Sequence, residues 1–117
     1  MQRKFRLTRS TDFKRVRRSG KSFAHPFVVL LVHGSSELQK VRVGVTAGRS
    51  VGGAVHRNKA KRLLRESIRP LLPSLQPGWD LILIARPALL SASLTEIRQV
   101  VQGLLERARM VTQSDES

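Results

Sequence analysis

Residues 51–66, VGGAVHRNKAKRLLRE, contain the pattern that decides how this chain folds. After the paired glycines, apolar residues recur every three or four positions, which is the spacing of a helix with one buried face. They are Ala60, Leu63, Leu64 and Ile68. Prolines follow at positions 70 and 73, where a missing backbone donor would end the helix. We therefore predict a helix over residues 54–69.

A second face of this helix is basic. Arg57, Lys61 and Arg65 are spaced by four residues, so they share a stripe about two turns, roughly 12 Å, long. A solvated helix face normally mixes charges of both signs, yet Glu66 is the only acid in the segment. Arginine can bind two phosphate oxygens at once, and Asn58 can bond a base edge or a 2′-hydroxyl. The stripe therefore predicts a surface that follows a folded RNA backbone.

Strands are predicted on both sides of the helix. Residues 41–46 alternate between valine and polar or small residues, as in a strand with one buried face. Residues 23–33 are rich in valine and leucine and predict a strand buried on both faces, followed by a turn at residues 34–36. We expect these two strands to form an antiparallel hairpin. Residues 79–85 predict a short, apolar strand after the helix.

Helices are also predicted near both ends, at residues 8–20 and 93–110. The capping residues are Ser10 or Thr11, with Gly20 at the far end, for the first helix, and Ser93 with Glu96 as a capping box for the last. The resulting order, α-β-β-α-β-α, indicates an α+β or mixed α/β sandwich with helices covering one sheet. The 117 residues fit one domain, and we expect residues 112–117 to be a disordered tail.

The charge of the chain predicts a polyanionic partner. Lys and Arg number 22 against 8 Asp and Glu, a formal net charge of +14. Residues 1–21 and residues 40–69 each hold nine basic residues and one acid, so the excess is concentrated in two blocks. Nucleic acid is the expected partner because basic side chains displace the counterions condensed on phosphates.

Other classes are disfavoured by composition. The chain has no cysteine, which excludes disulfides and thiolate metal sites. No apolar segment follows the basic N-terminus as a signal peptide would require, and the longest apolar run, residues 27–32, is far short of the roughly 20 residues of a membrane span. We expect a cytoplasmic protein.

Catalytic groups of a protein nuclease are not evident. Such an enzyme needs a metal-binding carboxylate cluster or paired acid–base groups, and the acids here are scattered along the chain. His25 and His33 could share a strand face but have no evident third ligand, so structural or surface roles are favoured. The loop at residues 48–53 lacks nucleotide-binding spacing, although its amides could hold one RNA phosphate.

The glycine turn followed by Ala-Val-x-Arg-Asn-x-x-Lys-Arg-x-x-Arg, residues 54–65, resembles the hallmark of the bacterial ribonuclease P protein family. The resemblance extends from residue 6 to about residue 106, in the right order. It includes Arg6-Leu7, Asp12-Phe13 and Gly20, then Arg42-Val43-Gly44, then Gly78-Trp79-Asp80 and Arg86-Pro87.

This resemblance implies a fold and a role. Members of the family form a two-layer sandwich of the ribosomal protein S5 domain 2-like type, with a mixed sheet and a left-handed β-α-β crossover around the Arg-Asn helix. They bind a catalytic RNA, one protein per RNA, that removes the 5′ leader from precursor tRNA. The RNA, not the protein, holds the catalytic Mg²⁺ ions, so no catalytic or metal-binding residue is expected in this chain.

The same resemblance implies two sets of contact residues. Those facing the catalytic RNA are Arg49, Arg57, Asn58, Lys61, Arg62 and Arg65. Those in the cleft for the single-stranded leader are Phe13, Arg17, Val29, Leu31 and Arg42. Arg17 and Leu31 stand where the family often has aromatic residues, and Ser50 replaces a usual basic residue, so leader binding here is expected to depend more on charge. For Phe13 the residues alone leave a cleft role and a core role open.

Two other functions remain open at this point. A ribosomal or RNA-assembly protein would share the size and charge, and the RNA that co-purifies would distinguish it. A metal-dependent nuclease acting alone would cleave RNA without any RNA subunit, and the scattered acids argue against it.

Overall fold

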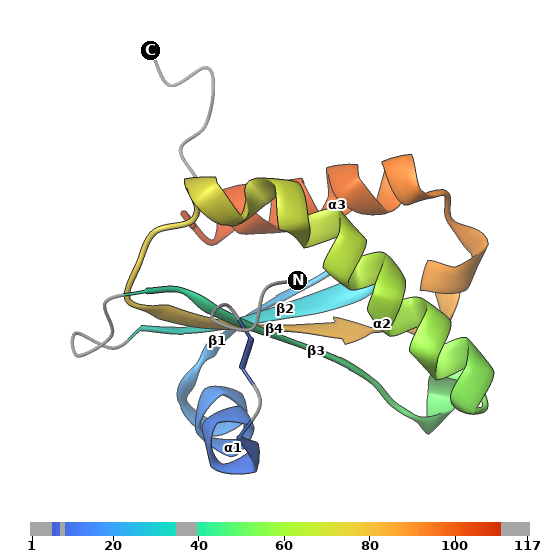
Figure 1. Cartoon of the computed structure of the whole chain (residues 1–117), viewed down its shortest axis with the longest axis horizontal. Coiled ribbons are helices and arrows are strands. Elements are labelled where there is room, and N and C mark those ends of the chain that lie inside the picture. Colours follow the sequence, from blue (N-terminus) through green and yellow to red (C-terminus); the bar gives the residue numbers. More distant parts are fainter. Residues whose placement is uncertain (1–5, 8, 35–39, 111–117) are drawn as a thin grey trace.

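The structure is a computed structural model that describes residues 6–7, 9–34 and 40–110. Its main elements follow the chain as three helices and four strands in these ranges (Figure 1). They are α1 (Ser10–Ser19), β1 (Lys21–Ala24), β2 (Val28–Gly34), β3 (Arg42–Ala47), α2 (Ala54–Ile68), β4 (Trp79–Ala85) and α3 (Leu94–Arg107). Short 3₁₀ turns, η2 (Arg49–Val51), η3 (Arg69–Ser74) and η4 (Pro87–Ser91), connect them. The predicted α+β class is confirmed, and the order is α-β-β-β-α-β-α, one strand more than expected.

The additional strand arises because the predicted strand 23–33 is two strands. His25 and Val28 exchange backbone hydrogen bonds of 3.0 and 3.2 Å across Pro26, and this turn folds β1 back on β2. β1 and β2 pair antiparallel, from Lys21 opposite Val32 to Ala24 opposite Val29. Proline cannot donate to a strand ladder, so it favours a turn at this point.

The predicted hairpin between residues 23–33 and 41–46 is wrong. The sheet order is β1-β2-β4-β3, so β4 lies between β2 and β3. β4 pairs antiparallel with β2 and parallel with β3. Five of the seven β4 residues are buried, and so apolar a strand is most stable in the middle of a sheet with both faces covered.

Two hydrophobic clusters lie on opposite faces of the sheet. The larger one packs α2 and α3 against the sheet and includes Leu64, Leu83 and Leu105, none of which is exposed. The smaller one, Leu7, Val16 and Ile82 with half-buried neighbours, lies under α1. In Figure 1, α1 lies on one side of the sheet and α2 and α3 on the other. The helix α1 therefore adds a partial third layer to the predicted two.

The predicted helix caps are partly confirmed. Ser93 Oγ accepts a hydrogen bond from the Glu96 N–H at 3.1 Å, and Glu96 Oε1 accepts one from the Ser93 N–H at 2.8 Å, which completes the capping box of α3. Gly20 ends α1 as expected, since its N–H donates to Val16 O. The expected N-cap at Ser10 or Thr11 is wrong, because Arg9 is the N-cap and its side chain makes no capping bond. The predicted tail, residues 112–117, lies outside the described residues.

Candidate nucleic-acid interface

The basic stripe of α2 forms as predicted. Arg57, Lys61 and Arg65 are half-buried along one side of the helix, while Ala60 and Leu64 are fully buried on another. In the described ranges, none of the three cations takes part in an ion pair. Their positive charge is therefore not balanced by acids of the described part of the protein.

The stripe continues onto the edge of the sheet through Arg6. This residue forms a parallel bridge with Val43 of β3, and the adjacent Leu7 N–H donates to Val43 O at 2.9 Å. Burial lowers the pKa of Arg65, and the nearby Arg6 cation lowers it further. Arg6 and Arg65 repel each other, and Arg65 is partly desolvated. A bound anion would therefore stabilise the charged forms of both side chains.

A second row of polar groups on α2 is exposed. Asn58 and Arg62 are exposed next to the stripe, and Arg69 beyond them contacts Glu66. Val55, in the first turn, is 80% exposed and is the only exposed large apolar side chain among the described residues. The sequence pattern had assigned no role to Val55, because only the packed structure shows that nothing in the described chain covers it.

Arg49 lies in the loop before α2. This exposed residue begins the 3₁₀ turn η2, and Gly53 is the N-cap of α2 without any side-chain capping bond. No acidic residue lies in the first turn of α2. Gly52 has a φ of 137°, a conformation that only glycine adopts readily, and a Cβ there would lie 3.0 Å from His56. The turn thus places Arg49 beside the positive end of the helix dipole.

Val29, one of the predicted leader residues, lies in a row of residues on the sheet face beside α1. Ala24, Val29, Ile84 and Thr46 form one row across all four strands, from β1 to β3. Directly paired residues point to the same side of a sheet, and Ile84 packs in the cluster under α1. All four side chains are exposed or half-buried. This row, which we call the open row, is a largely apolar strip beside α1.

A parallel row lies directly under α1. It runs across the sheet from β1 to β3 through directly paired residues: Ser22, Leu31, Ile82 and Gly44. Phe13 packs on the last of these: a Cβ on Gly44 would lie only 2.4 Å from Phe13 Cζ. The Phe13 side chain is half-buried and, like Leu31 and Ile84, packs against the cluster under α1, so it serves the packing of α1 and also borders the open row. Arg17, one turn further along α1, is exposed.

Ile84 and Thr46 also belong to this face, and neither was predicted as a site residue. The sequence of a strand does not reveal which strand it will pair with, and the pairing of β4 with both β2 and β3 joins residues far apart in the chain.

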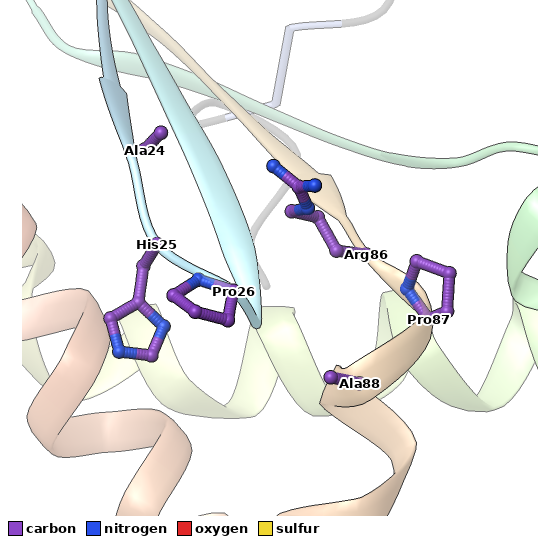
Figure 2. Close-up of a pocket in the computed structure, with 6 residues that line it drawn as sticks. All are labelled: Ala24, His25, Pro26, Arg86, Pro87 and Ala88. Carbon is purple, nitrogen blue, oxygen red and sulfur yellow. The ribbon is translucent and has the colours of Figure 1, made fainter.

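Next to the open row lies a hollow of about 450 Å³, between the β1–β2 turn and the end of β4 (Figure 2). It is lined by Ala24, His25, Pro26, Arg86, Pro87 and Ala88. Here His25 Nδ1 accepts the Phe27 N–H at 3.0 Å, a structural role.

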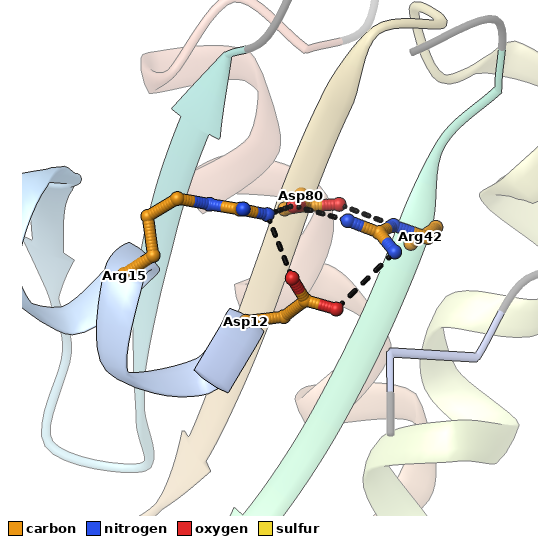
Figure 3. Close-up of polar contacts among 4 residues, drawn as sticks. All are labelled: Asp12, Arg15, Arg42 and Asp80. Atoms are coloured by element: carbon orange, nitrogen blue, oxygen red, sulfur yellow. Dashed lines mark hydrogen bonds and ion pairs between the residues drawn. The ribbon is translucent and has the colours of Figure 1, made fainter. Parts of the chain in front are cut away.

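Arg42, predicted to contact the leader, is bound within the protein. Its Nε donates to Asp80 Oδ1 at 2.8 Å, its Nη2 to Asp80 Oδ2 at 2.9 Å, and its Nη1 to Asp12 Oδ2 at 3.3 Å (Figure 3). Arg15 Nη2 bridges the same two carboxylates at 2.9 and 3.0 Å. The hydrogen bond to Asp80 raises the pKa of Arg42. The guanidinium therefore fastens α1 to the sheet, and its charge is offset by two acids.

Each acid in the described ranges already has a structural partner. Asp12 and Asp80 bind arginines, Glu96 closes the capping box, Glu66 pairs with Arg69, and Glu106 accepts Gln102 Nε2 at 3.4 Å. No group of three or more histidines or acids in these ranges lies close enough to hold a metal ion. None of the helices in the part that the structure describes is long and apolar enough to span a membrane.

A cationic helix face and an apolar sheet face, on a small basic α+β fold, define an RNA-binding protein. The family model described as Ribonuclease P matches residues 1–109. The ribonuclease P protein component of Herpetosiphon aurantiacus is 40% identical over 110 residues, which is 94% of this chain and 89% of that protein. That of Dehalococcoides mccartyi is 39% identical over 111 residues, 95% and 90% of the two chains. The chain belongs to the ribonuclease P protein family.

Solved structures agree with this assignment. The RNase P protein of Staphylococcus aureus matches with a TM-score of 0.82 and 27% identity over 92% of this chain and 98% of that one. The RNase P protein of Thermotoga maritima matches with a TM-score of 0.75 and 28% identity over 87% and 96%. As a ribonuclease P protein component, the chain is a partner of the ribonuclease P RNA in tRNA processing.

Proposed function

We propose that this protein binds the catalytic RNA of ribonuclease P through α2 and the 5′ leader of precursor tRNA through the sheet face beside α1. In this way it assists the Mg²⁺-dependent endonucleolytic removal of the leader in the cytoplasm. The observation that supports the first contact best is the stripe of Arg57, Lys61 and Arg65, which has no ion-pair partner among the described residues. The core anchors the helix on its other side through Leu64 and Ile68. A helix held in place in this way keeps its positive side chains in a fixed row, which can contact successive phosphates of a folded RNA.

The open row supports the second contact. Four strands about 4.8 Å apart make it roughly 14 Å long, enough for a few unpaired nucleotides. Phe13 borders it and can stack on a base, while Arg17 can bind a phosphate. Half-buried apolar groups can contact the faces of unpaired bases while cations at one side bind the phosphates. A duplex fits less well, because its bases are already stacked on one another.

Catalysis is assigned to the RNA subunit. Every acid in the described ranges is engaged in a helix cap, an ion pair or a side-chain hydrogen bond, which favours catalytic groups outside these residues. We propose that the RNA holds the Mg²⁺ ions. We also propose that one protein binds each RNA. The cations of this chain would lower the Mg²⁺ concentration needed to hold two polyanions together.

Reconstitution with the cognate ribonuclease P RNA tests the proposal. At low Mg²⁺, adding the protein should accelerate cleavage of a precursor tRNA at the mature 5′ end, and the protein alone should not cleave. Cleavage no faster with protein would refute the assisting role. Cleavage by the RNA-free protein would place the catalytic groups in this chain, and co-purification with ribosomal RNA instead of ribonuclease P RNA would indicate an assembly protein.

A further inference from the structure

A pocket of about 550 Å³ lies at the opposite edge of the molecule from the stripe on α2. It opens between β1, the end of β2, the start of β4 and the end of α3. β1 is one edge strand of the sheet, whereas the stripe and Arg6 lie beside β3, the other edge. A nucleotide in this pocket would therefore lie away from the stripe. Lys21 and Phe23 alternate along β1 with Ala24 of the open row, so they face the other side of the sheet.

Cations and aromatic rings line this pocket together. Lys21 comes from β1, and Arg107 and Arg109 come from the end of α3. Phe23 and Trp79 are half-buried, so part of each ring is accessible. The Arg107 guanidinium lies over the Phe23 ring, 5.7 Å from its centroid. None of the lining residues is acidic.

The sequence did not indicate this site. Residues 70–117 hold four basic and five acidic residues, so they show no cationic block. Arginines near a helix C-terminus are also favoured by the helix dipole alone. That explanation does not apply to Lys21, which is on a strand, nor to the two aromatic rings beside the cations.

We propose that this pocket binds an unpaired nucleotide of RNA, with the base on the aromatic rings and its phosphate beside Lys21, Arg107 and Arg109. Stacking on aromatic side chains together with arginine is how proteins bind single strands without base-specific hydrogen bonds. The pocket would be a third RNA contact, beyond the two proposed above. It rests on the proposed function only in that the protein is taken to bind RNA.

Trp79 makes the proposal directly measurable because it is the only tryptophan in the chain. A short oligouridylate is titrated into the full-length protein while tryptophan emission is followed. Base stacking should quench this emission with a saturable curve. Arg107→Ala removes an exposed side chain and should weaken the apparent affinity at least threefold, and Phe23→Leu should do the same by removing a ring while keeping apolar packing. Equal unfolding midpoints establish that the variants are folded.

Two comparisons separate the possible outcomes. Arg57→Ala should leave the quenching unchanged while weakening assembly with the ribonuclease P RNA. Heparin, a polyanion without bases, should bind without comparable quenching. Equal quenching by heparin, or unchanged quenching in both pocket variants, would overturn the nucleotide site. If the oligonucleotide gives no quenching but reconstitution succeeds, the pocket proposal alone is wrong.

Discussion

Arg42 and Asp80 stand directly opposite each other on the parallel strands β3 and β4, and two hydrogen bonds join their side chains. Asp80 is completely buried, and the pair also holds Asp12 and Arg15 of α1 (Figure 3). Because these bonds connect α1 to the sheet, they help set the position of Phe13 over Gly44. A residue expected to touch the substrate therefore shapes the surface beside it.

Asp80→Asn should destabilise the protein by about 3 kcal/mol, because it leaves Arg42 partly buried without its main counter-charge. Urea unfolding measures the change. Glu66→Gln is the matched control: it removes the negative charge from the exposed contact with Arg69 and should cost less than about 1 kcal/mol. Equal losses in both variants would contradict a structural role for the buried pair.

Gly44→Ala should cost about 1–3 kcal/mol, since the added methyl group would overlap the Phe13 ring. The double variant with Phe13→Leu should recover part of that loss, because leucine lacks the far end of the ring. Strictly additive effects would show that the two sites do not interact. As a control, Gly103→Ala in α3 has open space around its Cβ and should stabilise the protein by up to about 1 kcal/mol.

Arg57→Ala and Arg65→Ala should each weaken binding to the ribonuclease P RNA and reduce the salt dependence of binding. Log affinity falls with log salt concentration, and losing one phosphate contact should make that slope shallower by about 0.9. Titrations at several salt concentrations measure both quantities. Arg98→Ala, exposed on α3, is the charge-matched control and should leave the slope unchanged. If all three variants behave alike, the RNA contact is not on α2.

Phe13→Leu should weaken leader-dependent binding by about 1 kcal/mol or more, because it removes a stacking surface. Affinity of the reconstituted holoenzyme is compared for precursor tRNA with and without its leader. The loss should appear only with the leader present. An unchanged leader contribution in a variant with normal stability would make Phe13 a packing residue alone.

Local patterns predicted the helices well. The positions of Ala60, Leu64 and Ile68 indicated the buried side of α2, and all three are fully buried. The capping box at Ser93 and Glu96 was visible because it depends on two side chains and one turn of backbone. Such features form within a few residues, so their physics is contained in the local sequence.

The sheet was harder to predict. Residues 23–33 were predicted as one strand, and Pro26 was the only indication of a turn within it. Nothing near residues 41–46 showed that their neighbour would be β4, more than thirty residues later. Strand pairing depends on how much apolar surface each arrangement buries, which is a property of the whole chain.

The cationic helix and its apolar anchoring face follow from the amino-acid sequence alone, because charge and periodicity are local properties. Which cations remain available depends on the folded arrangement. Arg57, Lys61 and Arg65 have no ion-pair partner in the described ranges, whereas the charge of Arg42 is offset by Asp80 and Asp12. The physical reason is that the charge available to a partner depends on the acids that folding brings within a few ångströms, and those acids come from distant parts of the chain.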